Sequence, residues 1–289
     1  MKVAGFTFIR NAIKYDYPVV EAITSVLPVC DEFIVAVGRS DDETLQLIKN
    51  INSPKIKIIE TVWDDTLREG GQVLADETNK ALKAVSADTT WAFYIQADEC
   101  IHEKYLPAVK EAMLKWKDDR QVEGLLFNYL HFYGSYDYIG DSRKWYRKEI
   151  RIIRNNSGIT SYRDAQGFRK DSEKLKVKPI DAFVYHYGWV KPPQLQQAKL
   201  EVFNRLWHDE EWMKKNIKQA NEFDYSQIDS LAQFKDTHPA AMLQRIKNKN
   251  WKFTFDHSRK KLSLKSRVLM LIEQTMGWRI GEYKNYRTI

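Results

Sequence analysis

The sequence predicts an α/β protein with a mostly parallel central sheet flanked by helices. Short apolar runs rich in β-branched and aromatic residues alternate with amphipathic stretches at helical spacing through the first hundred residues. Of the 289 residues, 43% are hydrophobic and 29% are charged, which is typical of a globular protein. This length suits one large α/β domain with a helical extension, or two modest domains.

The elements of the first part follow one another in a regular order. Strands are expected at residues 3–9, 32–37, 55–62 and 90–95, and helices at 18–29, 42–51, 69–85 and 103–116. Because each strand is short, apolar and followed by a helical pattern, we expect parallel strands covered by helices on both faces.

The pattern changes further along the chain. Strands are expected at 124–132, 149–154 and 182–187, and residues 133–147, rich in Tyr, Gly, Asp and Arg, are expected to form a loop on the substrate side. From Pro192 onward the patterns are mostly helical and strongly charged. We therefore predict an α/β domain at 1–190 and a helical C-terminal extension packed on it at 191–289.

Composition limits the class of function and the compartment. The formal net charge of +7 favours anionic partners such as nucleotide phosphates, but the basic residues form no recognisable nucleic-acid reader motif, so no nucleic acid is expected. Cys30 and Cys100 are the only cysteines, which suits a reducing compartment. Without a signal-peptide pattern or an apolar run of about 18 residues, we expect a cytoplasmic protein.

The most informative feature is a pair of carboxylates directly after the fourth expected strand. Asp98 and Glu99 follow the apolar run, and ligands of open α/β sheets bind at the carboxyl ends of strands. Neighbouring residues of an extended chain face opposite sides, so we predict Asp98 as the ligand of a hard divalent cation and Glu99 as a structural residue. The alternative is that the pair caps the helix that starts near residue 103.

Two further side chains are candidates for chemistry. His186 lies in a short aromatic strand and can give an imidazole nitrogen to a divalent metal, or it can simply be packed and hydrogen-bonded. Asp164 stands among aromatic residues and arginines after a strand. It can serve as a general base, or it can pair with Arg163 or Arg169 on a loop.

Two loops on the expected ligand side have both a local and a functional interpretation. Residues 38–44 follow the second strand and open a helix, so Ser40 or Asp41 is a good N-cap, and the loop can also face a nucleotide base and ribose. Arg68 precedes Gly70 and Gly71, and it can reach a diphosphate or remain a solvent-exposed arginine.

Taken together, these motifs resemble the family 2-like glycosyltransferases with the GT-A fold. The resemblance lies in Phe8-Ile9-Arg10-Asn11, in Ser40-Asp41-Asp42-Glu43-Thr44, in Asn79-Lys80-Ala81-Leu82, in the run from Trp91 to Glu99 that looks like the strand leading into an Asp-x-Asp motif, and in His186-Tyr187-Gly188. It covers roughly residues 3 to 190. Their order and spacing together are more specific than any one motif.

The resemblance implies a UDP- or GDP-sugar donor, a saccharide or lipid-linked saccharide acceptor, and Mn²⁺ or Mg²⁺ as cofactor. It implies Asp98 and His186 as metal ligands and Asp164 as the base of an inverting transfer. The implied donor-binding residues are Phe8, Arg10, Arg39, Asp42, Arg68, Asn79 and Gln96. Two of them depart from the family pattern: Gln96 replaces the usual first Asp of Asp-x-Asp, and Arg39 stands where an acidic residue often reads the base or ribose.

Two other functions fit the same fold class. A sugar-phosphate nucleotidyltransferase also uses an α/β sheet and Mg²⁺, but the turn after the first strand here lacks the glycines of its phosphate loop. A nucleotide-sugar binding protein with an inactive site is the second alternative, suggested by the neutral Gln96.

The C-terminal part contains a basic amphipathic pattern. Residues 258–267 include five basic side chains, and residues 263–278 place leucine, valine and isoleucine beside them. Such a helix either lies on a membrane surface, here on its cytoplasmic face, or packs on its own domain.

Overall fold

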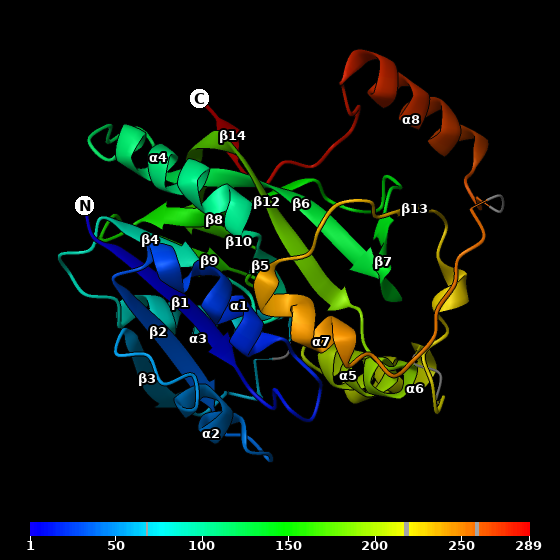
Figure 1. Ribbon diagram of the computed structural model, residues 1–289, viewed down its shortest axis with the longest axis horizontal. Coiled ribbons are helices and arrows are strands. Elements are labelled where there is room, and N and C mark those ends of the chain that lie inside the picture. The colour runs from blue at the N-terminus through cyan, green and yellow to red at the C-terminus, as the bar shows by residue number, and fades with distance from the viewer. Residues whose placement is uncertain (68, 217–219, 258–259) are drawn as a thin grey trace.

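The computed structural model describes residues 1–67, 69–216, 220–257 and 260–289 (Figure 1). Within them, a curled eleven-stranded sheet is flanked by helices, and a three-stranded sheet lies beside it. This arrangement confirms the predicted α/β class. The helices are α1 (Val19–Val26), α2 (Thr44–Lys49), α3 (Gln72–Lys83), α4 (Leu106–Trp116), α5 (Pro193–Arg205), α6 (Glu210–Asn216), α7 (Leu243–Lys247) and α8 (Leu264–Met276), with single 3₁₀ turns at Leu27–Val29, Glu103–Tyr105, Tyr225–Gln227 and Ala240–Met242.

The main sheet has the strand order β3-β2-β1-β4-β8-β6-β7-β13, and β12 pairs with β6, β5 and β14. The small sheet has the order β11-β10-β9. The strands are β1 (Val3–Ile9), β2 (Glu32–Gly38), β3 (Ile56–Thr61), β4 (Trp91–Tyr94), β5 (Glu99–Ile101), β6 (Gly124–Tyr133), β7 (Ser135–Gly140), β8 (Lys148–Arg154), β9 (Ile159–Tyr162), β10 (Gly167–Lys170), β11 (Glu173–Lys174), β12 (Lys176–Trp189), β13 (Leu231–Gln233) and β14 (Arg287–Thr288).

The first four strands are parallel, as the sequence predicts. β1 pairs in parallel with β2 and β4, and β2 pairs in parallel with β3. Alternate residues of β2 enter two cores: Phe33 and Val35 pack on the side of α1 and α4, whereas Ile34 packs on the side of α3. Because both faces are covered by helices, the strand is apolar throughout, and the carboxyl ends of β1 and β4 are left as the open edge.

The second half of the sheet is mixed. β8 is antiparallel to β4 and to β6, and β12 runs parallel to β6. The strand expected at 182–187 therefore extends over Lys176–Trp189 and ends at the same edge as β1 and β4. The expected loop at 133–147 is only partly a loop, because residues 135–140 form β7 against β6.

The C-terminal hundred residues combine helices with long irregular segments. α5, α6, α7 and α8 are present, but β13 pairs with β7 and β14 pairs with β12, so this part also adds edge strands to the main sheet. A purely helical extension is therefore not confirmed. The reason is that β7 and β12 have unpaired backbone N–H and C=O groups along one edge. The short strands β13 and β14 form hydrogen bonds with these groups. The division into 1–190 and 191–289 stays a prediction.

Candidate active site

A cavity of about 610 Å³ lies at the carboxyl ends of β1, β4 and β12. Helix α5, with its loop to α6, contributes Lys199, Phe203 and Leu206 to its lining. The position agrees with the rule that ligands of open α/β sheets bind where the strands end. The volume is within the range of sites for small organic ligands.

The structure brings six of the predicted site residues together in this cavity. They are Phe8, Arg10, Gln96, Asp98, Asp164 and His186. The remaining predicted residues are not in its lining or cannot be located: Arg39 is exposed, Asp42 and Asn79 are hydrogen-bonded elsewhere, and Arg68 lies outside the described residues. Their assignment to a donor stays a prediction.

Asp98 points into the cavity from the segment between β4 and β5. Its Oδ2 accepts a hydrogen bond from Lys199 Nζ at 3.1 Å, and its Oδ1 lies 3.8 Å from His186 Nε2. Burial alone would raise the pKa of this carboxyl, but the positive charge of Lys199 holds it well below its ordinary value. Asp98 is therefore an ionised carboxylate with one oxygen facing a ring nitrogen.

Glu99 has the structural role that the sequence predicts for it. Its side chain is fully buried and takes a bidentate pair of hydrogen bonds from Arg151, both at 2.8 Å. The hydroxyl of Tyr129 donates to Oε1 at 2.7 Å, and the backbone N–H of Gln96 donates to Oε2 at 3.1 Å. These four bonds fix the turn that holds Asp98 at the cavity.

Two histidines determine which nitrogen of His186 faces Asp98. His131 Nε2 lies 2.8 Å from the carbonyl oxygen of Tyr146, which can only accept, so this nitrogen carries a proton. Burial, with His186 beside it, lowers the pKa of His131 to about 3, so its Nδ1 is an acceptor. His186 Nδ1, 3.0 Å away, must then donate.

The same chain of hydrogen bonds leaves His186 Nε2 with a free lone pair. Burial lowers the pKa of His186, so the ring is neutral and carries its single proton on Nδ1. This tautomer is assigned from the hydrogen-bond partners. A metal-binding histidine typically donates its other N–H to a partner that fixes the ring, and His131 is that partner here.

Asp98 and His186 fit a divalent cation as two ligands. A Cβ added to Gly188 would lie 2.6 Å from His186 Nε2 and 2.8 Å from Asp98 Oδ2, so glycine leaves room for both donor atoms to converge. Over the described ranges, no group of three or more His, Cys, Asp or Glu side chains can hold a metal. Cations of the Mg²⁺ type are commonly held by one or two protein ligands, with substrate phosphates and water completing the shell.

Asp164 is positioned by the turn between β9 and β10. A Cβ on Gly71 would lie 3.1 Å from the Cβ of Asp164, and Gly71 itself has a φ of 72°, so glycine is needed for this approach. Burial raises the pKa of the Asp164 carboxyl. Arg169 donates instead to the carbonyls of Phe168 and Asn285, which argues against the ion pair with Arg169, whereas the charge of Arg163 still acts on Asp164. The role of Asp164 as a general base stays a prediction.

Aromatic residues form the wall at the β1 side of the cavity. The rings of Phe8 and Trp63 are 5.7 Å apart, and the Arg10 guanidinium lies 5.3 Å from the Trp63 ring. Arg10 also donates to Asp65 at 2.8 Å. Trp63 Nε1 is buried without a hydrogen-bond partner and lies against Gly38, where an added Cβ would be 2.3 Å from it, so this wall presents an apolar surface to the cavity.

Sequence reasoning did not identify Lys199, Lys191 or Gln196. Lys199 donates to Asp98 and to the Gly188 carbonyl at 3.0 Å, and the buried Lys191 donates to the Tyr15 carbonyl at 2.6 Å. Gln196 lines the cavity with a buried Oε1 that has no partner. For Gln196 and Lys199, the one feature of the sequence that pointed to a shared site was their i, i+3 spacing, which places them on one face of a helix after Pro192.

Two predicted donor residues have clear local roles. Asp42 accepts hydrogen bonds from the backbone N–H groups of Lys14 at 2.7 Å and Thr44 at 3.0 Å, which joins the turn after β1 to the first residue of α2. Asn79 accepts from the N–H of Ser161 at 2.7 Å and donates to its carbonyl at 3.4 Å, so it joins α3 to β9. These contacts explain both side chains without a ligand.

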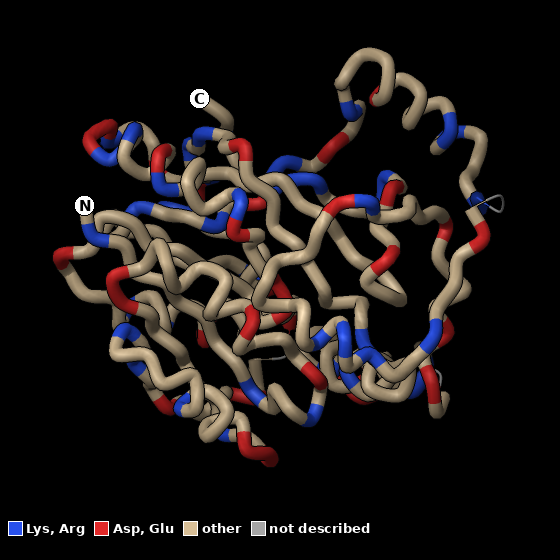
Figure 2. The backbone as a smooth tube through the Cα atoms, in the orientation of Figure 1, with Lys and Arg blue, Asp and Glu red and all other residues tan. Residues whose placement is uncertain are grey.

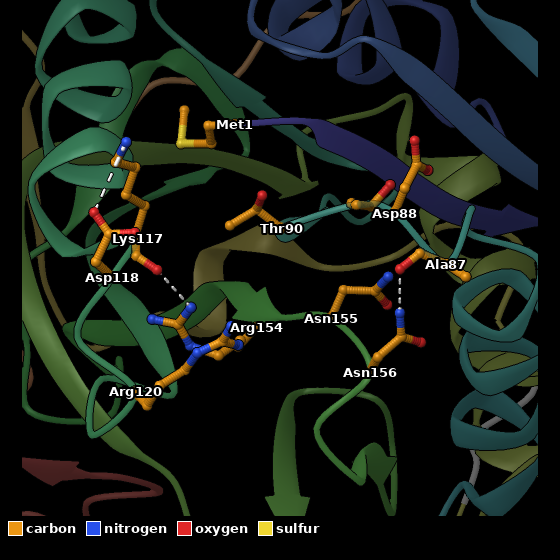
Figure 3. A pocket seen from close by; sticks show the side chains of 11 residues that line it. Met1, Ala87, Asp88, Thr90, Lys117, Asp118, Arg120, Arg154, Asn155 and Asn156 are labelled. Atoms are coloured by element: carbon orange, nitrogen blue, oxygen red, sulfur yellow. Dashed lines mark hydrogen bonds and ion pairs between the residues drawn. The ribbon is translucent and has the colours of Figure 1, made fainter.

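A second cavity of about 420 Å³ lies at the opposite edge of the sheet, near Met1 (Figure 3). Arg154 is its most buried charged side chain, but its guanidinium donates to the carbonyls of Trp116, Lys117, Asp119 and Val122. Because these four carbonyls use the donors of Arg154, its guanidinium is committed to closing the end of α4.

Comparisons with known proteins give only distant likenesses. No protein-family model and no curated protein matches the sequence. TarS of S. aureus aligns over 70% of this chain and 39% of its own, at 16% identity and a TM-score of 0.43. TarS 1–349 in complex with UDP aligns over 46% and 37%, at 23% identity and a TM-score of 0.35.

Glucosyl-3-phosphoglycerate synthase from Mycobacterium tuberculosis, in complex with Mn²⁺, UDP-glucose and phosphoglyceric acid, aligns over 45% of this chain and 43% of its own. The identity is 13% and the TM-score is 0.31. The aligned parts span less than half the length of these solved chains. They leave the family of this chain open, so its function has to be inferred from the site itself.

Proposed function

We propose that this chain is a metal-dependent glycosyltransferase that transfers a sugar from a nucleotide-diphosphate donor to a hydroxyl acceptor with inversion. The observation that carries the proposal is the convergence of the Asp98 carboxylate and the unprotonated Nε2 of His186 at the carboxyl ends of β4 and β12. A carboxylate and an imidazole lone pair facing the same point are a cation site, and the cavity beside them has room for a sugar nucleotide.

The proposal includes the finer features that the sequence motifs imply. These are Mn²⁺ or Mg²⁺ as cofactor, a UDP- or GDP-sugar donor, a saccharide or lipid-linked saccharide acceptor, a hexosyl transfer of the family 2 type in glycan biosynthesis, and a cytoplasmic location. The aromatic wall of Phe8 and Trp63 supports a stacked nucleotide base beside Arg10.

The residues of the chain divide the reaction between them. Asp98 and His186 would hold the cation, which when bound offsets the charge that develops on the departing diphosphate. Lys199 adds positive charge at the wall formed by α5, beside Asp98. Asp164 accepts the proton of the acceptor hydroxyl, whose oxygen bonds to the anomeric carbon while the bond from that carbon to the diphosphate oxygen breaks.

The raised pKa of Asp164 matches this role, because a base with a higher pKa takes a hydroxyl proton more readily. The nucleoside diphosphate leaves with the electron pair of the broken bond.

The experiment is donor turnover with UDP-glucose and GDP-mannose in the presence of Mn²⁺, with nucleoside diphosphate release as the readout. We expect turnover by the wild type, a loss of at least about 100-fold in Asp98→Asn, and unchanged turnover in Asp88→Asn, a matched substitution of an exposed side chain at the opposite edge. Asp164→Asn should retain calorimetric donor binding but lose transfer.

Three results would contradict the proposal. The first is equal turnover by the wild type and Asp98→Asn. The second is release of pyrophosphate from NTP and a sugar phosphate, which would indicate a nucleotidyltransferase. The third is tight binding of a sugar nucleotide without turnover on any of a panel of saccharide acceptors, which would indicate a binding protein.

A further inference from the structure

Helix α8 is tied to the body of the protein by one acidic side chain, Glu273. Glu273, on the inner side, forms ion pairs with Arg143 at 2.7 Å, Arg147 at 3.1 Å and Arg279 at 3.6 Å. Its side chain is only 19% exposed. These ion pairs anchor the helix, Leu269, Met270 and Ile272 are half-buried, and no residue of α8 is fully buried.

An apolar stripe of the same helix is turned outward. Leu264, Val268 and Leu271 follow i, i+4, i+7 spacing and are 81%, 57% and 60% exposed. Beyond the helix end, Trp278 is 61% exposed. Leu269, Met270 and Ile272 of the same helix are half-buried, whereas the stripe is left on the surface. An exposed apolar stripe of this kind is a candidate contact surface for an external partner.

Basic side chains border this stripe on both sides. At 100° per residue, Arg267 lies on one side of the line through Leu264 and Leu271, and Lys265 lies on the other, and both are exposed. Glu273 is the only acidic residue of α8, and it faces inward. Lys and Arg positions predominate at the start of the helix, which projects at the periphery (Figures 1 and 2).

The charge pattern selects among partners. A second copy of the chain would bring two basic borders together with no acidic residue on either outward face, so self-association is disfavoured. A surface that is both apolar and negatively charged complements the stripe and its border. The headgroup region of an anionic bilayer has both properties.

We propose that the outward face of α8 docks the protein on anionic membrane surfaces, with Leu264, Val268 and Leu271 inserted between headgroups and Lys265 and Arg267 at the phosphates. The docking is interfacial, because no helix in the described part of the chain has the length and apolar character to cross a bilayer. Trp278 at the end of the helix adds an aromatic anchor of the kind found at membrane interfaces.

The test is vesicle flotation of the full chain with phosphatidylcholine alone and with phosphatidylcholine mixed with phosphatidylglycerol. We expect flotation with the anionic vesicles only. The double variant Lys265→Gln/Arg267→Gln should weaken binding about 25-fold, at about fivefold for each charge. Leu264→Ser/Leu271→Ser should weaken it by about 100-fold or more.

Leu114→Ser is the matched control, because Leu114 is an exposed leucine, at 46%, on the different helix α4. It should float like the wild type. Donor turnover in solution should be the same in all these variants, so failure of docking and failure of the proposed function are distinguishable.

Four outcomes would overturn the proposal. They are absence of flotation with either vesicle, equal flotation with both vesicles, unchanged flotation of Leu264→Ser/Leu271→Ser, and a concentration-dependent dimer that this double variant abolishes. The last outcome would show that the stripe covers a second copy of the chain.

Discussion

The buried pair of Glu99 and Arg151 gives the sharpest test of how the turn at Asp98 is held. Both side chains have no exposed surface, and the bidentate contact is supplemented by hydrogen bonds from Tyr129 and Gln96. Glu99→Gln keeps the shape of the side chain but removes its charge. The guanidinium of Arg151 is then buried without compensation, which costs far more than the loss of one hydrogen bond.

The expected magnitude follows from this burial. Breaking a buried ion pair on one side costs about 3–5 kcal/mol. With an unfolding entropy of about 2.1 cal/mol/K per residue, a chain of 289 residues loses about 5–8 °C in Tm. Thermal unfolding followed by circular dichroism measures this shift.

Two controls separate the pair from a general effect of substitution. Asp88→Asn breaks the exposed contact with Lys2, so its Tm should stay within about 1 °C of the wild type. The double variant Glu99→Gln/Arg151→Met should lose less than the sum of the two single variants, because neither charge remains alone. A Tm shift below about 2 °C in Glu99→Gln, or strict additivity, would refute the reasoning.

Three further predictions concern pH and metal binding. Burial raises the pKa of Glu149 to about 7, so the stabilisation from its protonated form is complete below pH 4.5 and is lost as the pH rises through 7. Glu149→Gln should therefore raise the free energy of unfolding by about 2–3 kcal/mol above pH 7 and leave it unchanged below pH 4.5. Urea denaturation at the two pH values measures this difference. Lys199→Met should tighten calorimetric Mn²⁺ binding in the absence of donor, because Lys199 competes for Asp98; weaker or unchanged affinity would contradict that contact. His131→Phe should weaken Mn²⁺ binding about 10- to 100-fold by releasing the tautomer of His186, and undiminished affinity would remove His131 from this role.

The strand and helix pattern of the first hundred residues could be predicted because it depends on neighbours along the chain. The apolar residues repeat at a spacing that identifies the element, as in the β-branched run of β2 and the amphipathic stretch of α1. The same local logic placed Asp98 at a strand end and turned Glu99 to the opposite side. It also found the apolar and basic pattern of residues 263–278.

Local patterns could not show which distant side chains meet. Lys199 reaches Asp98 across 101 positions, and His131 reaches His186 across 55. Asn79 shows that a local motif can also mislead. It was predicted to bind the sugar-nucleotide donor, but its side chain accepts a hydrogen bond from Ser161 of β9. Each of these outcomes depends on the path of the chain between elements.

The sequence by itself determined the α/β class, the parallel order of the first strands and the position of a carboxylate at the edge where ligands bind. Only the tertiary structure decided that the Lys199 ammonium faces that carboxylate and that Nε2 of His186 is free. It also decided that the apolar stripe of α8 points away from the protein. The physical reason is that periodicity fixes which residues share a face, whereas only the packing of whole elements fixes what that face meets.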